Sequence, residues 1–251
     1  DFCLSRGLGD VYKRQTCAPL VNLWGFGFNK KDSVTPTMID SLKTFVGYQK
    51  VHLEGKKIVK DDPRLLLNCS AIAKGYSCDV IARLLEKEGV ENYMVLIGGE
   101  VVVKGVNQNG VCWRTGINLP EDDPDGIKNN YDEIVQLCKK GAIATSGNYR
   151  NFYIKDGKKY AHTINPRTGY PAEQSVLSAT IVANDCMTAD AYATAFMAMG
   201  LEKARQMADT LPEIEYYVIY ADESGKHQIE FSKGMLQYLP KRKTMISSDN
   251  S

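Results

Sequence analysis

Apolar residues recur along this chain with two different periods, and these periods predict its helices and strands. Between residues 71 and 88, every fourth position is apolar, at Ile72, Tyr76, Val80 and Leu84. Side chains four residues apart lie above one another on a helix. The spacing therefore predicts a helix over 71–88 with one apolar stripe.

Three further helices are predicted from terminal signals. Thr35 followed by Pro36 is typical of a helix start, because threonine caps the first turn and proline is tolerated there. Gly200 marks a helix end. The predicted helices span residues 36–47, 186–199 and 201–209.

Strands are predicted where short apolar runs stand between turn residues. Gly98–Gly99 and Asp156–Gly157 are expected hairpin turns, 92–97 is expected to be a buried strand, and 16–28 a loop rich in glycine and aromatic residues. The other strands or hairpins are expected at 48–60, 100–104, 111–118, 133–138, 151–155, 159–164, 176–183 and 215–231. Helices and hairpins intersperse without a regular βαβ rhythm. The predicted fold class is α+β, with mixed, largely antiparallel sheets and interspersed helices.

The two ends of the chain differ from the rest. Residues 1–15, DFCLSRGLGDVYKRQ, show no structural periodicity and resemble translated adapter read-through, so we expect them to be non-native. One domain is then expected over 16–239, followed by a polar tail over 240–251. In this interpretation the protein is N-terminally truncated, and any signal or anchor is lost with its start.

Composition narrows the class of protein. Among 251 residues, 31 Lys+Arg balance 30 Asp+Glu, which argues against binding to nucleic acid. A hydrophobic fraction of 43% supports a sizeable core, and no apolar run reaches the roughly 18–20 residues of a membrane helix. The seven cysteines contain no C-x-x-C pair and are expected to be mostly buried free thiols.

The first chemical candidate is Asp190 with Thr194. Their spacing places a carboxylate and a hydroxyl on one face of the predicted helix, and such hard oxygen donors suit Mg²⁺. The alternative is an Asp that favours the helix dipole and a packed Thr, without a metal, and spacing alone favours this alternative.

Two glycine-containing segments are candidates for ligand contact. Lys74 and Gly75 stand in the first turn of the predicted 71–88 helix, where a phosphate would be attracted. Gly98–Gly99, ahead of Glu100, offers backbone that a flat ligand can approach closely. A solvated lysine, a packing glycine and a plain hairpin turn are the alternatives.

Two loop-like segments follow. Thr145, Ser146 and Gly147 carry hydroxyls and N–H groups that, in a turn, commonly contact phosphate. His162 precedes a loop rich in proline and glycine, HTINPRTGYP, and loops often carry function. A purely structural histidine is the alternative.

The order of these segments resembles one family, the ApbE family of FAD:protein FMN transferases. The resemblance rests on AIAKGY, IGGE, ATSGNYRNF, HTINPRTGYP and TADAYATA, with support from PLVNLWGFG and WRTGIN, and covers roughly residues 16–235. It implies a Mg²⁺-dependent enzyme that transfers FMN from FAD to a Thr or Ser hydroxyl of an acceptor protein and releases AMP. An FAD diphosphatase giving FMN and AMP, or a non-catalytic FAD-binding protein, remains the alternative.

The resemblance also implies roles for individual residues. Metal ligands are implied at the backbone carbonyl of Ala71 and at Asp190 and Thr194, with Asp190 and His162 as catalytic residues and His162 accepting a proton from the attacking hydroxyl. The candidates for cofactor binding are Asn68, Lys74, Gly98, Gly99, Thr145, Ser146, His162 and Ile164.

Two positions depart from the family pattern. Asn68 stands where the family usually has Asp, and Tyr12 to Gln15 occupy the place of a flavin-contacting segment. Family members are commonly exported and often lipid-anchored, so the resemblance implies an extracytoplasmic, membrane-anchored lipoprotein. The implied partner is a respiratory redox complex subunit.

Overall fold

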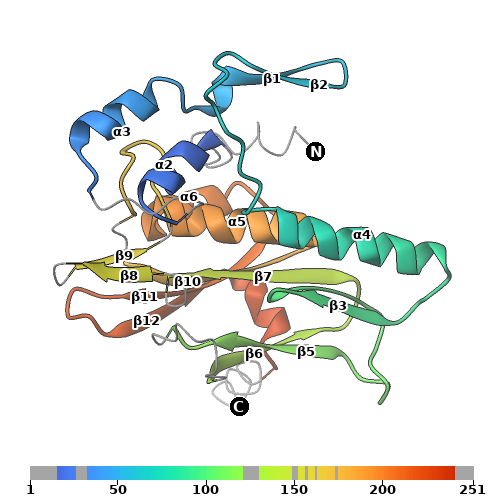
Figure 1. Cartoon of the computed structure of the whole chain (residues 1–251). Helices are drawn as coiled ribbons and strands as arrows, with labels where there is room; N and C mark the ends of the chain where they lie inside the picture. The colour runs from blue at the N-terminus through green and yellow to red at the C-terminus, as the bar shows by residue number, and fades with distance from the viewer. Residues whose placement is uncertain are drawn as a thin grey trace. The chain divides into compact units, whose positions relative to one another are not determined.

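The computed structural model describes residues 16–26, 33–120, 130–148, 152–155, 158–161, 163–172 and 175–240, with the side chains of 152–155 and 158–161 left aside. The chain divides into two compact units. The first comprises residues 1–71 and 151–173, and the second comprises 72–150 and 174–251 (Figure 1). The prediction for residues 1–15 lies outside the described residues, as does that for the tail beyond Pro240.

The first unit is built from short elements. They are α2 (Ala18–Leu23), α3 (Pro36–Lys43), a 3-10 turn η2 (Tyr48–Lys50), β1 (Val51–Glu54), β2 (Lys57–Lys60), β8 (Phe152–Lys155) and β9 (Lys158–Ala161). Thr35 caps α3 as predicted, its Oγ1 accepting a hydrogen bond from the Met38 N–H at 3.3 Å. β1 pairs with β2, and β8 with β9, each antiparallel, which confirms both predicted hairpins.

The prediction of a loop over 16–28 is wrong for residues 18–23. Pro19 lies in the first turn of α2, where its missing N–H is tolerated, and every residue of this helix except Asn22 is buried. Leu20 packs with Ile39 and Ile164 in one apolar cluster. Burial against partners distant in sequence, rather than local periodicity, therefore makes this segment helical.

The second unit holds the main sheet. Its elements are α4 (Ala73–Lys87), β3 (Tyr93–Ile97), β4 (Glu100–Lys104), β5 (Trp113–Asn118), β6 (Tyr131–Leu137), β7 (Gly141–Gly147), β10 (Val176–Ala183), α5 (Cys186–Met199), α6 (Leu201–Ala208), β11 (Glu215–Ala221), β12 (His227–Phe231) and a 3-10 segment η3 (Lys233–Tyr238). Six strands form one sheet in the order β12-β11-β10-β7-β4-β3, with every neighbouring pair antiparallel. The predicted α+β class is confirmed.

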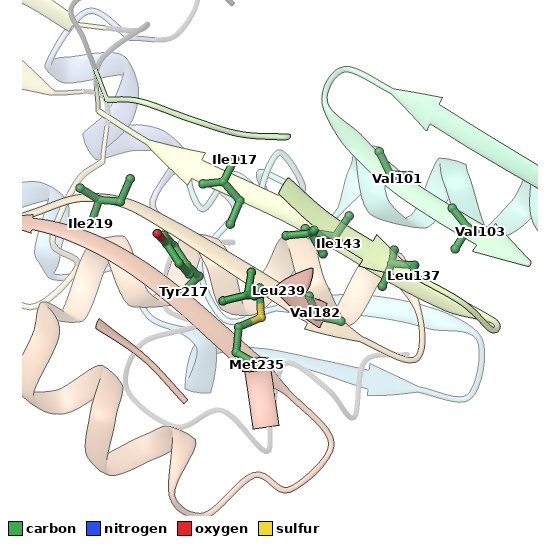
Figure 2. Close-up of a cluster of buried hydrophobic side chains, with 11 residues drawn as sticks. Val101, Val103, Ile117, Leu137, Ile143, Val182, Tyr217, Ile219, Met235 and Leu239 are labelled. Atoms are coloured by element: carbon green, nitrogen blue, oxygen red, sulfur yellow. The ribbon is translucent and has the colours of Figure 1, made fainter. Parts of the chain in front are cut away.

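Each face of this sheet carries its own layer. Helices α4 and α5 lie along one face, and the β5–β6 hairpin lies on the other (Figure 1). Successive strand residues point to opposite faces. Val102 accordingly packs with Cys78 and Cys186 of the helices, whereas Val101 and Val103 join a larger cluster on the hairpin side (Figure 2). The sheet thus separates two apolar cores.

The β5–β6 hairpin is tied at its open end. A disulfide joins Cys112 to Cys138, next to the paired residues Trp113 and Leu137. Cys78 and Cys186 are free thiols and buried as expected, Cys17 is also buried, and Cys69 is exposed. The expectation of free thiols is therefore wrong for Cys112 and Cys138, because strand pairing brings the two cysteines opposite each other across 26 residues of sequence.

The predicted stripe of α4 does not face the core. Tyr76, Val80 and Leu84 are 44%, 41% and 52% exposed. The helix instead buries Gly75, Cys78, Asp79 and Ala82, which have the same helical spacing. Small residues occupy this face because α4 packs closely against α5.

Strand β3 is also more exposed than predicted. It lies at the edge of the six-stranded sheet, Tyr93 is buried, and Leu96 is 60% exposed. Among the described residues, no helix is both long and apolar enough to cross a membrane.

Candidate active site

The candidate site of the second unit centres on the place where the first turns of α4 and α5 meet. The Gly75 N–H in α4 donates a hydrogen bond to Oδ2 of Asp190 in α5 at 3.0 Å, and Asp190 is only 2% exposed. A Cβ at Gly75 would lie 2.2 Å from the Cys186 carbonyl oxygen and 2.9 Å from Cβ of Asp190. Only glycine permits this approach, so the glycine fixes Asp190 against α4.

Thr194 lies one turn after Asp190 and faces the sheet. Its Oγ1 is 3.1 Å from Oγ of Ser146 on β7, and both hydroxyls sit where α5 packs on that strand. The structure thus brings Asp190, Thr194 and Ser146 to one side of α5, as a carboxylate and two hydroxyls. All three are hard oxygen donors.

Thr145 and Ser146 lie on a strand, and the expectation of a turn there is wrong. β7 pairs with β10 in the middle of the sheet, and Thr145 is in register with Thr180. Their Oγ1 atoms are 2.8 Å apart. Since neighbouring strand residues face opposite ways, Ser146 points toward α5 while Thr145 points toward the hairpin side.

The start of α5 is closed by two carboxylates. Asp185 caps it, accepting from the Thr188 N–H at 2.8 Å. Asp79 reaches across from α4 and accepts from the N–H groups of Cys186 and Met187, both at 2.9 Å. The first three donors of α5 are therefore satisfied within the protein. Burial raises the pKa of Asp79, and these two N–H groups partly oppose that shift.

Lys74 crosses the Gly98–Gly99 turn. Its Nζ is 2.5 Å from Oε1 of Glu100 and 3.4 Å from the Gly98 carbonyl oxygen. A Cβ at Gly98 would lie 2.8 Å from Cδ of Lys74, so this glycine leaves room for the lysine stem. Gly99, with φ +102, has no heavy atom within 4 Å of such a Cβ. Of the two glycines, only Gly99 offers the open surface predicted.

Glu100 is a functional candidate that sequence reasoning did not single out. It is 2% exposed, and its Oε2 is buried without a hydrogen-bond partner among the described residues. Burial raises the pKa of this carboxyl, and the Lys74 ammonium partly lowers it. A glutamate directly after a two-glycine turn is the available signal, since the turn aims the first residue of β4 back toward α4.

The remaining predicted residues belong to the first unit. Oδ1 of Asn68 accepts from the Ser70 N–H at 2.7 Å, and Ala71 is buried. Ile164 is fully buried and forms a bridge with Pro171, within a loop whose Gly169 carbonyl accepts from Trp24 Nε1 at 2.8 Å. His162 lies outside the described residues.

The second-unit residues can perform two kinds of chemistry. One carboxylate with two hydroxyls can hold a hard cation, and a half-exposed lysine beside a helix start can pair with phosphate. In the described part of the chain, no group of three or more His, Cys, Asp or Glu side chains could hold a metal. A cation at Asp190 would thus need hydroxyl, carbonyl or substrate oxygens to complete its shell.

Comparison with known proteins gives a consistent picture. Residues 4–218 match the model of the ApbE family. The chain is 42% identical over 225 residues to an FAD:protein FMN transferase of Vibrio cholerae and 37% identical over 217 residues to one of Klebsiella pneumoniae. These alignments cover 89% and 84% of the chain, but only 65% and 61% of the two relatives.

A solved structure agrees with these relatives. The flavin transferase ApbE from Vibrio cholerae superposes with a TM-score of 0.81 at 37% identity, covering 94% of this chain and 74% of that one.

Proposed function

The chain belongs to the ApbE family, and on this basis we propose that it transfers FMN from FAD to a Thr or Ser hydroxyl of an acceptor protein and releases AMP. The relatives named FAD:protein FMN transferase support the activity. The observation that carries the proposal is the hydrogen bond from the Gly75 N–H, next to Lys74 in α4, to Asp190 of α5, with Thr194 one turn further along α5. Asp190 and Thr194 are the candidate ligands for a cation, and Lys74 is the candidate partner of a phosphate.

We propose that Asp190 and Thr194 hold Mg²⁺, together with the backbone carbonyl of Ala71. The donors fit this ion, because a buried carboxylate and a hydroxyl are hard oxygens and few enough to leave positions for phosphate and water. Bound Mg²⁺ would supply charge neutralisation on the diphosphate. Gly75 orients the Asp190 carboxylate, and Ser146 orients the Thr194 hydroxyl.

Contacts to FAD are also proposed. In the second unit, Lys74 would pair with a phosphate, and Gly99 offers an open backbone surface to the ligand. Ser146 points from β7 toward α5, and its hydroxyl lies beside that of Thr194. The full proposed set of FAD contacts is Asn68, Lys74, Gly98, Gly99, Thr145, Ser146, His162 and Ile164.

His162 is proposed as the general base. As the acceptor oxygen bonds to the FMN phosphorus, the diphosphate P–O bond breaks, AMP leaves, and the hydroxyl proton passes to the imidazole. A positioned base typically contributes about 10²–10⁴-fold. His162→Ala should therefore slow transfer at least about 10²-fold while FAD and Mg²⁺ binding stay within about tenfold. Loss of FAD binding with fast transfer from the bound state would contradict this role.

One experiment tests the transfer itself. The protein is incubated with FAD, Mg²⁺ and a candidate acceptor, and the acceptor's intact mass and free AMP are measured. We expect the acceptor to gain the mass of FMN and AMP to appear in equal amount. AMP without an acceptor would instead identify an FAD diphosphatase, and FAD bound without AMP a binding protein.

The metal assignment has its own test. Asp190→Ala should abolish Mg²⁺ binding and nearly all transfer, because Asp190 is the one carboxylate proposed for the metal. Asp209→Ala is the matched control, since Asp209 is exposed at the end of α6. Mg²⁺-dependent transfer retained in Asp190→Ala would refute the assignment.

We also propose an extracytoplasmic location, with a respiratory redox complex subunit as acceptor. The Cys112–Cys138 disulfide supports the location, because disulfides persist mainly in oxidising compartments. Trapping of free thiols in intact cells, followed by mass measurement of this cysteine pair, tests it. Two alkylated cysteines in the native protein would contradict the proposal.

A further inference from the structure

We infer that Glu100 is a positioning residue, which holds the Lys74 ammonium in place for the diphosphate of the flavin nucleotide. The inference rests on the proposed function for the identity of the ligand. It concerns a group that acts through another side chain, because Glu100 itself is buried.

Three contacts fix the lysine at both ends of its stem. Its Cγ and Cδ lie against Gly98, where an added Cβ would be 3.8 Å and 2.8 Å away. Its Nζ meets the Gly98 carbonyl oxygen and Oε1 of Glu100. A free lysine has four rotatable bonds and many rotamers. These contacts therefore hold Lys74 against the Gly98–Gly99 turn even though its side chain is 47% exposed.

The two partners of the Glu100–Lys74 ion pair differ in burial. The Glu100 side chain is 2% exposed, and Oε2 has no hydrogen-bond partner in the described chain. Its carboxylate thus depends on Lys74, whereas the half-exposed ammonium has three donors and keeps the third for a ligand. A buried carboxylate with one partner is an expensive arrangement for stability alone. Its placement is better explained by what it does to the lysine.

Two opposing effects decide the direction of the expected change. The Glu100 charge repels a phosphate, so its removal alone would tighten binding. Loss of the carboxylate also leaves the Lys74 side chain free to move. Ligand binding must then bear the entropy cost of ordering this side chain. Ordering should dominate, as in protein kinases, where a lysine contacts the phosphates only when a glutamate pairs with it.

A double-mutant cycle tests the coupling. FAD binding to the whole chain in Mg²⁺ is measured for wild type, Glu100→Gln, Lys74→Met and the double variant. Glu100→Gln should weaken FAD binding about tenfold in the wild-type background and less than twofold when Lys74 is already methionine. Riboflavin, which has no diphosphate, should bind the wild type and Glu100→Gln equally. Glu100→Asp, which keeps the charge on a shorter side chain, should be intermediate.

The matched control is Glu86→Gln. Glu86 lies on α4, the helix that also carries Lys74, but near its other end. It pairs with Lys140 at 2.9 Å. It should leave FAD binding unchanged. If Glu100→Gln does not fold, as judged by its melting curve, the same cycle is run with Glu100→Asp.

The outcomes separate this inference from the proposed function. Unchanged or tighter FAD binding in Glu100→Gln overturns the inference, as does a loss that persists in the Lys74→Met background or extends to riboflavin. Such results leave the transferase proposal standing. A wild-type chain that binds no FAD would overturn both.

Discussion

Helices α4 and α5 begin beside each other, yet their first turns are built differently. The first three N–H groups of α5 are satisfied by the carboxylates of Asp79 and Asp185. In α4, the N-cap residue Ile72 supplies no side-chain hydrogen bond, and the first turn carries a lysine and no acid. The start of α5 thus carries two carboxylates of the protein, whereas the start of α4 carries a lysine and one carboxylate, that of Asp190, which accepts from the Gly75 N–H. This difference supports the proposed position of a phosphate near the start of α4.

The two helices also pack differently. Every residue of α5 except Met187 is buried, so its whole circumference contributes to the core. Helix α4 contacts α5 through small and polar residues and leaves large apolar residues exposed. The first turns of α4 and α5 can therefore approach closely because the residues between them are small, and not because these residues bury a large apolar area.

The largest effect on stability should come from adding a side chain at the contact between α4 and α5. Gly75→Ala would push a methyl group into the Cys186 carbonyl and the Asp190 side chain. We expect a loss of about 3 kcal/mol in the free energy of unfolding, measured by urea denaturation. Ser77→Ala, on the exposed side of the same helix, is the control and should change stability little. Equal stability of the two variants would show that the helices do not need this close contact.

Removal of the α5 caps should be the next largest effect, and it should be unequal. Asp79→Ala leaves the buried Cys186 N–H and the half-buried Met187 N–H without this acceptor and should cost about 2–3 kcal/mol. Asp185→Ala removes a conventional N-cap and should cost about 1 kcal/mol. Thermal or chemical denaturation of both variants measures the difference. A larger loss in Asp185→Ala would reverse this ranking of the caps.

The exposed stripe of α4 predicts a small effect. Leu84 is 52% exposed, so Leu84→Gln should change the free energy of unfolding by less than about 1 kcal/mol. Ala82→Leu, on the buried face of the same helix, should be clearly more destabilising because the added atoms have no space. The same denaturation curves give both values. A large loss of stability in Leu84→Gln would show that the apolar stripe packs in the core.

Asp222 is a half-buried counterpart of these caps and should show the smallest effect. Its carboxylate accepts from the Ser224 hydroxyl, from Gln228, and from the Lys226 and Ser224 N–H groups, which lowers its pKa to about 2. Because the folded pKa lies below the unfolded value of about 3.9, this stabilisation is present above pH 4 and is lost as pH falls toward 2. Asp222→Asn should lower the melting temperature slightly at pH 7 and not at pH 2. A deficit that stays constant with pH would contradict the role of charge.

Local signals in the sequence predicted much of the fold. Thr35–Pro36 located the start of α3, Gly200 the end of α5, and Gly98–Gly99 the turn between β3 and β4. Each of these signals acts within a few residues of itself, so tertiary structure does not override it.

The errors came where distant contacts decide. In α4, two sets of residues share the helical period, and the larger apolar set is the exposed one. The set that is buried runs through Gly75, Cys78 and Asp79 because α5 approaches closely. Strand β7 was missed for a similar reason. Its small residues become a central strand only between β4 and β10.

The candidate site shows the same division. The pairing of Asp190 with Thr194 follows from helical spacing, and the structure places Asp190 against α4 and Thr194 against β7. The caps from Asp79 and the ion pair of Glu100 with Lys74 join residues 107 and 26 positions apart, which no local pattern reveals.

The bond between Cys112 and Cys138 has a practical consequence for handling the protein. Any single cut of the backbone between these cysteines leaves the two pieces covalently joined. A protease nick in this stretch would thus be invisible on a non-reducing gel and would appear as two bands only after reduction. Comparison of the two gels therefore shows whether the backbone is cut between the two cysteines and whether the disulfide is intact in a preparation.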